Sequence, residues 1–172
     1  DTARLVEGVS RLAALKAKRT SAETGGALTA GVMAIMTDGV DRADRVTQQA
    51  AVNAIRADSM IAPKAEAEVA FVLKSDLMGP GVTAADVLRA TDFVVPCFEI
   101  VDSRIRDWKI KIQDTVADNA SCGVLTLGGV RKSPRQLDLA LAGMVLEKNG
   151  EVISTSTGAA VQGSPANAVA WL

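Results

Sequence analysis

Two strand-like runs, residues 65–73 and 93–101, set most of the fold that this sequence can adopt. The first alternates small or apolar residues with Glu66 and Glu68, and the second is apolar except for Glu99. Successive side chains of a strand point to opposite faces, so the first two glutamates share one face. We therefore expect a sheet that displays carboxylates on one side.

Shorter signals surround these runs. Apolar residues at helical spacing predict an amphipathic helix over residues 2–19, and a Thr-x-x-Asp start predicts a short helix over 83–90. The Asn-Gly pair at 149–150 predicts a β-hairpin. Pro96 interrupts the second run, which favours an edge strand or a bulge there.

Together these patterns predict an α+β fold, a β-rich single domain. Residues 1–60 are expected to form an N-terminal helical or irregular part, and residues 61–172 the catalytic β-rich core. The hydrophobic content of 48% is sufficient for a buried core.

Composition excludes several function classes. The chain has no histidine, so a Ser-His or Cys-His mechanism or a His-ligated zinc cannot arise within it. A net charge of -1 and an aromatic content of 3% argue against nucleic acid and against an anionic membrane as partners. Two cysteines form no disulfide framework, which favours the cytoplasm.

The three glutamates allow more than one interpretation. Glu66 and Glu68 could be the solvated acids of a half-exposed strand. Glu99, within an apolar run, must be paired, protonated or bound to a metal if it is buried. Arg104 or Arg106 could pair with it. Alternatively, all three glutamates could surround one Mg²⁺ or Mn²⁺ ion, which prefer oxygen ligands.

Substrate contacts have weaker signals. Arg104 could bind an anionic substrate through a two-pronged contact to a carboxylate. The stretch 119–123, with Asn119 and Ser121, is small and polar, as expected where a ligand approaches the backbone. By local chemistry alone, the same composition is more typical of a helix cap or an ordinary loop.

Several segments, taken in order, resemble the hydratase/decarboxylase branch of the fumarylacetoacetate hydrolase superfamily. They span residues 61–172, and stretches 104–114 and 163–165 are more similar to the hydratases than to the decarboxylases. The resembling segments are residues 63–73, 76–83, 96–105, 116–121, 146–150 and 163–167.

The resemblance implies a mixed, barrel-like rolled sheet with short flanking helices. It also implies Mg²⁺ or Mn²⁺ held by Glu66, Glu68 and Glu99, and a substrate pocket lined by Ser121 and its neighbours. The implied activity is hydration of 2-hydroxypenta-2,4-dienoate to 4-hydroxy-2-oxopentanoate, in the meta-cleavage degradation of aromatic compounds. Decarboxylation of 4-oxalocrotonate and a non-catalytic partner subunit are the alternatives. The resemblance also implies the partners of the protein. These are further copies of the same chain in a homo-oligomer, the sister decarboxylase, and a small 2-hydroxydienoate or 2-oxo acid as substrate.

Two family motifs do not occur in this sequence, a Gly-x-Lys-Ile-Gly strand and a Gln-Pro-Asp-x-Gly loop with a functional acid. We therefore expect an internal segment and the C-terminal strands of the fold to be missing from these 172 residues. The general acid/base is expected to belong to the missing segments, so no catalytic residue is assigned.

Overall fold

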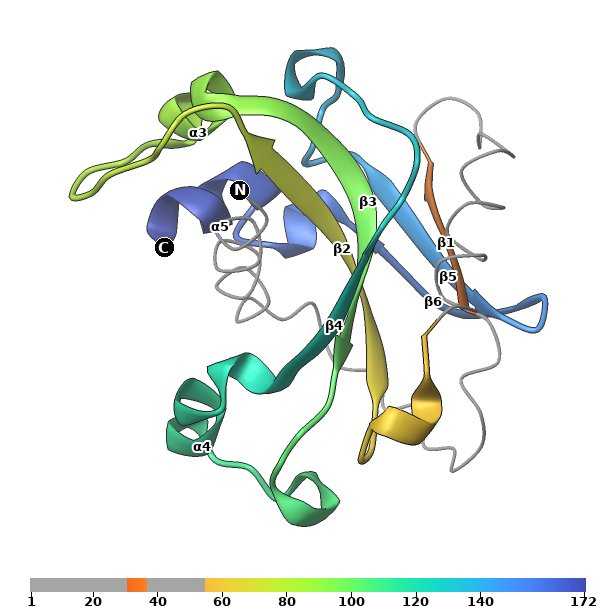
Figure 1. Ribbon diagram of the computed structural model, residues 1–172. Coiled ribbons are helices and arrows are strands. Elements are labelled where there is room, and N and C mark those ends of the chain that lie inside the picture. The colour runs from red at the N-terminus through yellow and green to blue at the C-terminus, as the bar shows by residue number, and fades with distance from the viewer. Residues whose placement is uncertain (1–30, 37–54) are drawn as a thin grey trace.

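The computed structural model describes residues 31–36 and 55–172, whose strands form two three-stranded antiparallel sheets (Figure 1). The first sheet has the order β2 (Lys64–Leu73), β3 (Thr91–Val101), β4 (Cys122–Leu127). The second has the order β1 (Gly31–Met36), β5 (Gly143–Lys148), β6 (Glu151–Thr157). The helices are α3 (Ala84–Ala90), α4 (Ile112–Ala117) and α5 (Pro165–Trp171). Single 3₁₀ turns are η1 (Ala57–Ser59), η2 (Arg106–Trp108), η3 (Asn119–Ser121), η4 (Pro134–Gln136) and η5 (Gly158–Ala160).

This combination of sheets and short helices confirms the α+β expectation, whereas the barrel-like closure stays a prediction. The helix expected over residues 2–19 lies outside the described residues, as does most of the expected N-terminal part. Within the described ranges, no helix is long and apolar enough to cross a membrane.

Strands β2 and β3 occupy the two runs that the sequence marked out, and they pair along their whole length. Lys64 lies opposite Val101 at one end, and Leu73 lies opposite Thr91 at the other. The chain passes from β2 to β3 through α3, not through a tight turn. Both strand predictions are confirmed, to within two residues at each end.

Pro96 lies in the central strand of its sheet, so the edge-strand prediction is wrong. No register shift occurs at this residue either, because the irregularities lie at 72–73 and 100–101. The carbonyl of Pro96 accepts a hydrogen bond from the N–H of Gly128 (2.7 Å), just after β4 ends at Leu127. In an antiparallel strand the N–H and C=O of one residue point to the same side. The N–H that proline lacks would therefore face the point where the neighbouring strand stops.

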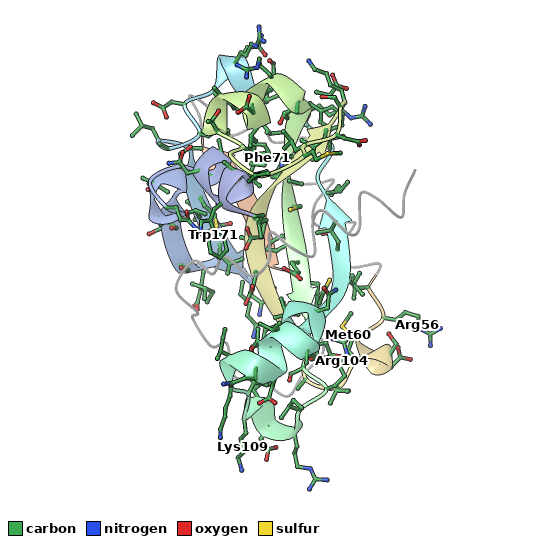
Figure 2. The ribbon with its side chains drawn as sticks, turned by 90° about the vertical axis from the view of Figure 1, so that its left-hand side faces the viewer. Arg56, Met60, Phe71, Arg104, Lys109 and Trp171 are labelled. Atoms are coloured by element: carbon green, nitrogen blue, oxygen red, sulfur yellow. The ribbon has the colours of Figure 1, made fainter. Side chains whose placement is uncertain are left out.

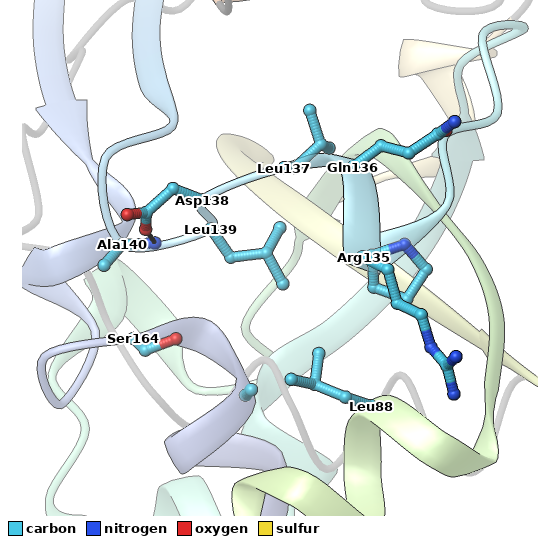
Figure 3. A pocket seen from close by; sticks show the side chains of 10 residues that line it. Leu88, Arg135, Gln136, Leu137, Asp138, Leu139, Ala140 and Ser164 are labelled. Carbon is cyan, nitrogen blue, oxygen red and sulfur yellow. Dashed lines mark hydrogen bonds between the residues drawn. The ribbon is translucent and has the colours of Figure 1, made fainter.

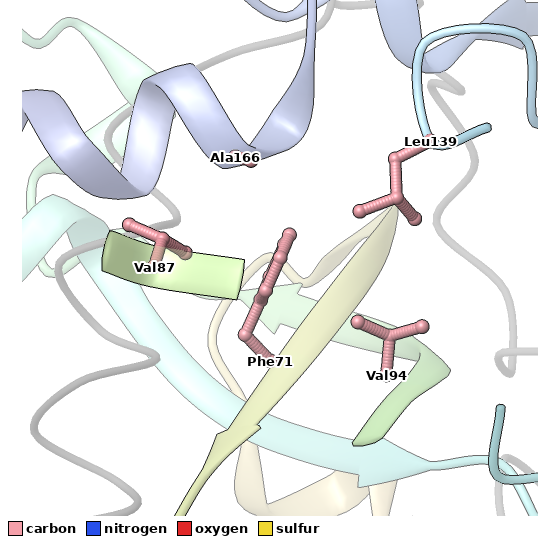
Figure 4. Close-up of a cluster of buried hydrophobic side chains, with 5 residues drawn as sticks. All are labelled: Phe71, Val87, Val94, Leu139 and Ala166. Carbon is pink, nitrogen blue, oxygen red and sulfur yellow. The ribbon is translucent and has the colours of Figure 1, made fainter. Parts of the chain in front are cut away.

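The face of the first sheet opposite the glutamates is apolar and covered. At one end, Phe98 and Ile100 pack against Met144 and Leu146 of β5, which brings the second sheet onto this face. At the other end, Phe71 is the largest member of a second cluster (Figure 4). That cluster consists of Phe71, Val87, Val94, Leu139 and Ala166, contributed by both strands, α3, α5 and the loop before β5. The hydrophobic effect thereby fixes which face of β2 points inward.

Helix α3 begins as its sequence predicts. The Thr83 hydroxyl accepts a hydrogen bond from the N–H of Asp86 (3.2 Å), and the Asp86 carboxylate accepts one from the N–H of Thr83 (2.8 Å). This capping box satisfies two N–H groups that a helix end leaves free. Arg89 pairs with Asp86 across the next turn of the helix. The predicted helix over 83–90 is confirmed.

The predicted hairpin is formed by β5 and β6, with Asn149 (φ 54°) and Gly150 (φ 84°) at its tip. Two left-handed residues give the tight turn whose twist suits paired strands. We expect Gly150→Ala to lower the free energy of unfolding by about 1 kcal/mol, since a Cβ is strained at positive φ although no atom lies within 4 Å. Denaturant titration measures this, and Asn149→Gly should cause a much smaller change. Equal stability of Gly150→Ala and the parent would contradict the left-handed turn.

Candidate functional site

Glu66, Glu68 and Glu99 lie on one face of the first sheet, as alternation predicts for the first two. Glu66 is directly opposite Glu99 across the β2–β3 ladder, and Glu68 is directly opposite Cys97. Residues opposite each other in an antiparallel pair share a face and have Cβ atoms about 5 Å apart. The fold therefore brings Glu99 to the same face as Glu66 and Glu68, although it lies more than 30 residues further along the sequence.

Glu99 is a buried carboxylate whose two oxygens accept no hydrogen bond from the described residues. The residue is 1% exposed, and neither Oε1 nor Oε2 has a hydrogen-bond partner in the part of the chain that the structure describes. Burial raises the pKa of Glu99 to about 7; the nearby Cys122 side chain opposes this shift, and the charge of Glu66 adds to it. Such a group is costly in the folded protein unless a proton or a cation neutralises it.

Glu68 is half-buried and is affected by the other two acids. Burial raises its pKa to about 8, with further contributions from the charges of Glu66 and Glu99. The Cys97 thiol on the same face has a pKa raised well above its usual value by burial and by the charges of Glu68 and Glu99. These groups therefore hinder one another's ionisation, and a bound cation would remove that repulsion.

The three glutamates of this carboxylate face do not form a ready-made metal cage among the described residues. Within residues 31–36 and 55–172, no three acidic, thiol or imidazole side chains already converge as a set of metal ligands. An ion bound by the three glutamates would require rotation of their side chains. Carboxylate oxygens are the donor type that hard divalent cations prefer, and the two unpartnered oxygens of Glu99 can turn without breaking a hydrogen bond.

Arg104 does not pair with Glu99, and neither does Arg106 in the described part of the chain. The Arg104 guanidinium donates to the carbonyls of Asp102 (3.1 Å) and Cys122 (2.8 Å) and forms an ion pair with Asp118 (3.5 Å). Arg104 lies at the end of the first sheet that is remote from Phe71 (Figure 2). The ion-pair interpretation of Glu99 is therefore wrong, and Arg104 connects parts of the loop between β3 and β4.

The turn before β4 has unusual backbone geometry. Asn119, Ala120 and Ser121 have φ values of 49°, 57° and 59°, three consecutive left-handed residues without a glycine. Each such residue costs roughly 1 kcal/mol, and strain of this kind is concentrated at functional sites. Ser121 is 1% exposed and its Oγ has no hydrogen-bond partner among the described residues, whereas Asn119 is exposed. Of the predicted substrate contacts, Ser121 is the one with an unused buried hydroxyl.

Two residues near this site, Asp102 and Trp108, were not predicted to have a role in it. The Asp102 carboxylate accepts hydrogen bonds from the N–H groups of Ile61 (2.9 Å) and Ala62 (2.7 Å), and Trp108 Nε1 donates to the carbonyl of Ala62 (2.8 Å). Trp108 also lies under the Lys64 ammonium, 4.2 Å from the ring centre. An acid at the end of a strand is a weak signal, since its partners lie 40 residues away in the sequence.

A groove of about 500 Å³ lies elsewhere, between α3, α5 and the loop before β5 (Figure 3). None of the three glutamates lines it. Its lining residues are Leu88, Pro134, Arg135, Gln136, Leu137, Asp138, Leu139, Ala140, Ser164 and Ala166. The groove is therefore separate from the carboxylate face.

No family model matches this chain. Over 115 residues it is 67% identical to a 2-hydroxypent-2,4-dienoate hydratase from Pseudomonas putida, an alignment that covers 67% of this chain and 52% of that protein. It is 63% identical over 118 residues to a 2-hydroxyhexa-2,4-dienoate hydratase from Comamonas testosteroni, covering 69% of this chain and 45% of that protein.

A solved structure matches the same part of the fold. It is 4-oxalocrotonate decarboxylase from Pseudomonas putida G7, complexed with magnesium and adipate, with 43% identity and a TM-score of 0.62. The match covers 65% of this chain and 43% of the decarboxylase. The chain spans about half the length of the curated relatives it matches. The resemblance seen in the sequence is thus confirmed: over about two thirds of its length, this chain is a homologue of the 2-hydroxydienoate hydratases.

Proposed function

We propose that the protein is a metal-dependent hydro-lyase that hydrates 2-hydroxypenta-2,4-dienoate to 4-hydroxy-2-oxopentanoate, in the meta-cleavage degradation of aromatic compounds. The observation that carries this proposal is the 67% identity to a 2-hydroxypent-2,4-dienoate hydratase. One water molecule is added to the five-carbon acid, and nothing is oxidised or reduced. A homo-oligomer in the cytoplasm is part of the proposal.

We assign Glu66, Glu68 and Glu99 as the ligands of Mg²⁺ or Mn²⁺. Three features support this set: the shared face, the two oxygens of Glu99 that accept no hydrogen bond from the described residues, and the raised pKa of Glu68 and Glu99. The related decarboxylase was solved with magnesium and also with calcium. When bound, the cation would act as a Lewis acid on oxygens of the 2-oxo acid.

The chain's own residues would act on the substrate from the turn before β4. Ser121 has a buried hydroxyl that makes no hydrogen bond to any described residue and would donate to a substrate oxygen, and Asn119 is within the same strained turn. Arg104 would bind an anionic substrate only by giving up part of its network with Asp102, Cys122 and Asp118. Ser121 is therefore the substrate contact that we favour.

The function is tested by offering the purified protein 2-hydroxypenta-2,4-dienoate with Mg²⁺ and following loss of the conjugated chromophore and formation of 4-hydroxy-2-oxopentanoate. We expect turnover that stops when a chelator removes the cation and returns when Mg²⁺ is added. Turnover that persists in excess chelator would contradict the metal requirement.

Decarboxylation of 4-oxalocrotonate is the second candidate, favoured by the 43% identity to a decarboxylase of known structure. In a parallel assay with this substrate, release of one CO₂ per molecule would overturn the hydratase proposal. A protein that binds Mg²⁺ but converts neither substrate would instead be a non-catalytic partner, to be tested by co-purification with the sister decarboxylase.

A further inference from the structure

Asp102 connects the two strands that carry the glutamates. It lies directly after β3, three residues beyond Glu99, and is 8% exposed. Its two carboxylate oxygens accept hydrogen bonds from the N–H groups of Ile61 (2.9 Å) and Ala62 (2.7 Å), shortly before β2 begins at Lys64. Both oxygens are therefore used to hold a segment that lies 40 residues earlier in the chain.

The Asp102 contact lies at the end of the β2–β3 pair that no chain connection closes. The two strands are joined at the opposite end, beyond Leu73, and the ladder is irregular between Val72 and Leu73. No tight turn therefore sets their register near Glu66. A shift of one residue would move Glu66 and Glu68 to the apolar face, because side chains alternate along a strand. Burial of the apolar face opposes such a shift, and the Asp102 contact at the free end opposes it further by holding the segment that precedes β2.

Asp102 also holds the strained turn. Its backbone N–H donates to the carbonyl of Ser121 (2.7 Å), and its carbonyl accepts from the Arg104 guanidinium (3.1 Å). Ala62, whose N–H donates to the Asp102 carboxylate, is held by a further contact, because Trp108 Nε1 donates to the carbonyl of Ala62 (2.8 Å). One residue thus connects the start of β2, the end of β3 and the turn that contains Ser121.

We propose that Asp102 is a positioning residue, whose carboxylate keeps Glu66 and Glu68 in register with Glu99. The role in metal binding rests on the function proposed above, whereas the role in strand register does not. Asparagine at this position offers one acceptor oxygen where two N–H donors need one each, and its NH₂ group would face a backbone N–H. Asp102→Asn therefore removes half of the contact with little change in side-chain volume.

The test compares Asp102→Asn with Asp107→Asn, an exposed acid of the same loop that contacts only Lys109 (3.6 Å) in the described structure. Two quantities are measured well below the unfolding temperature, Mn²⁺ affinity by titration and the amide exchange rates of β2. We expect Asp102→Asn to weaken Mn²⁺ binding by about 10-fold, the size of effect that the loss of one net hydrogen bond has. We expect the amides of residues 64–68 to exchange at least about 10-fold faster, in proportion to the loss of local stability. Asp107→Asn should change neither by more than about twofold.

A lower melting temperature for Asp102→Asn, with unchanged Mn²⁺ affinity and β2 exchange, would overturn the proposal, because it would indicate general stability only. If the parent protein binds no Mn²⁺, the proposed metal site is wrong, and the exchange rates still decide the role of Asp102 in register. If Asp102→Asn does not fold, Asp102→Glu is measured instead, because it keeps the charge and displaces both acceptor oxygens from Ile61 and Ala62 by one methylene. Unchanged β2 exchange and Mn²⁺ affinity in Asp102→Glu would then overturn the proposal.

Discussion

Replacing Glu99 by glutamine is expected to lower metal-dependent turnover by about 10²- to 10³-fold, the usual loss when one group that stabilises charge is removed. The fold should survive, because neither oxygen of Glu99 makes a hydrogen bond within the described structure that the amide would lose. A neutral side chain is also easier to bury at 1% exposure. We therefore expect metal-free Glu99→Gln to be more stable than the parent at pH 8, where the parent carboxyl is ionised.

Turnover at fixed Mg²⁺ and thermal unfolding without metal measure the two effects separately. Glu66→Gln should cause a similar loss of activity, since Glu66 lies directly opposite Glu99. Glu151→Gln, at an exposed position in the β5–β6 hairpin, is the control and should leave both quantities unchanged. Full activity of Glu99→Gln at low Mg²⁺ would show that Glu99 is not a metal ligand.

The parts of this fold that were predictable depend on neighbouring residues in the sequence. Alternation placed Glu66 and Glu68 on one face, because that period belongs to any strand. The capping box at Thr83 and the Asn149-Gly150 turn were predicted for the same reason: a few adjacent residues satisfy their own backbone groups. The partner of each strand is not a local property, and this is where the predictions became less reliable.

Pro96 illustrates the limit. A proline inside a strand-like run argues for an edge strand. Here the missing N–H costs little, because the neighbouring strand β4 stops at Leu127, next to Pro96. Where β4 stops is not encoded in the residues around Pro96. Arg104 is a second case, because its pairing with Asp118 depends on how the loop folds back. In the left-handed turn at 119–121 only Asn119 readily adopts that conformation, so Ala120 and Ser121 gave no indication of the geometry.

The largest effect on stability is expected from pH, through Glu68 and Glu99. Their pKa values of about 8 and about 7 in the folded protein lie above the ordinary value of 4.5. Between about pH 4.5 and about pH 8, these two carboxyls therefore bind more protons in the folded protein than in the unfolded chain. The contribution of the two carboxyls is fully present below about pH 4.5 and is lost as the pH rises through 7 and 8.

In the metal-free protein, we expect the melting temperature to fall as the pH is raised from about 5 to about 8.5, by an amount set by these two carboxyls. Each unit of pKa difference corresponds to about 1.4 kcal/mol, so the loss reaches several kcal/mol, with the share of Glu68 reduced by its partial exposure to solvent. Saturating Mg²⁺ should remove the fall, because the cation binds the ionised carboxylates and releases their protons.

The measurement is thermal unfolding over this pH range, with and without Mg²⁺. The double variant Glu68→Gln/Glu99→Gln isolates the two groups, since every other titrating residue remains. Without metal, its difference from the parent should be small at pH 5 and should grow steadily toward pH 8.5. The stability of the double variant itself should not respond to Mg²⁺. If the difference in metal-free stability between the parent and this variant is constant from pH 5 to 8.5, the two carboxyls ionise normally. The carboxylate face would then lack the repulsion from which we infer cation binding.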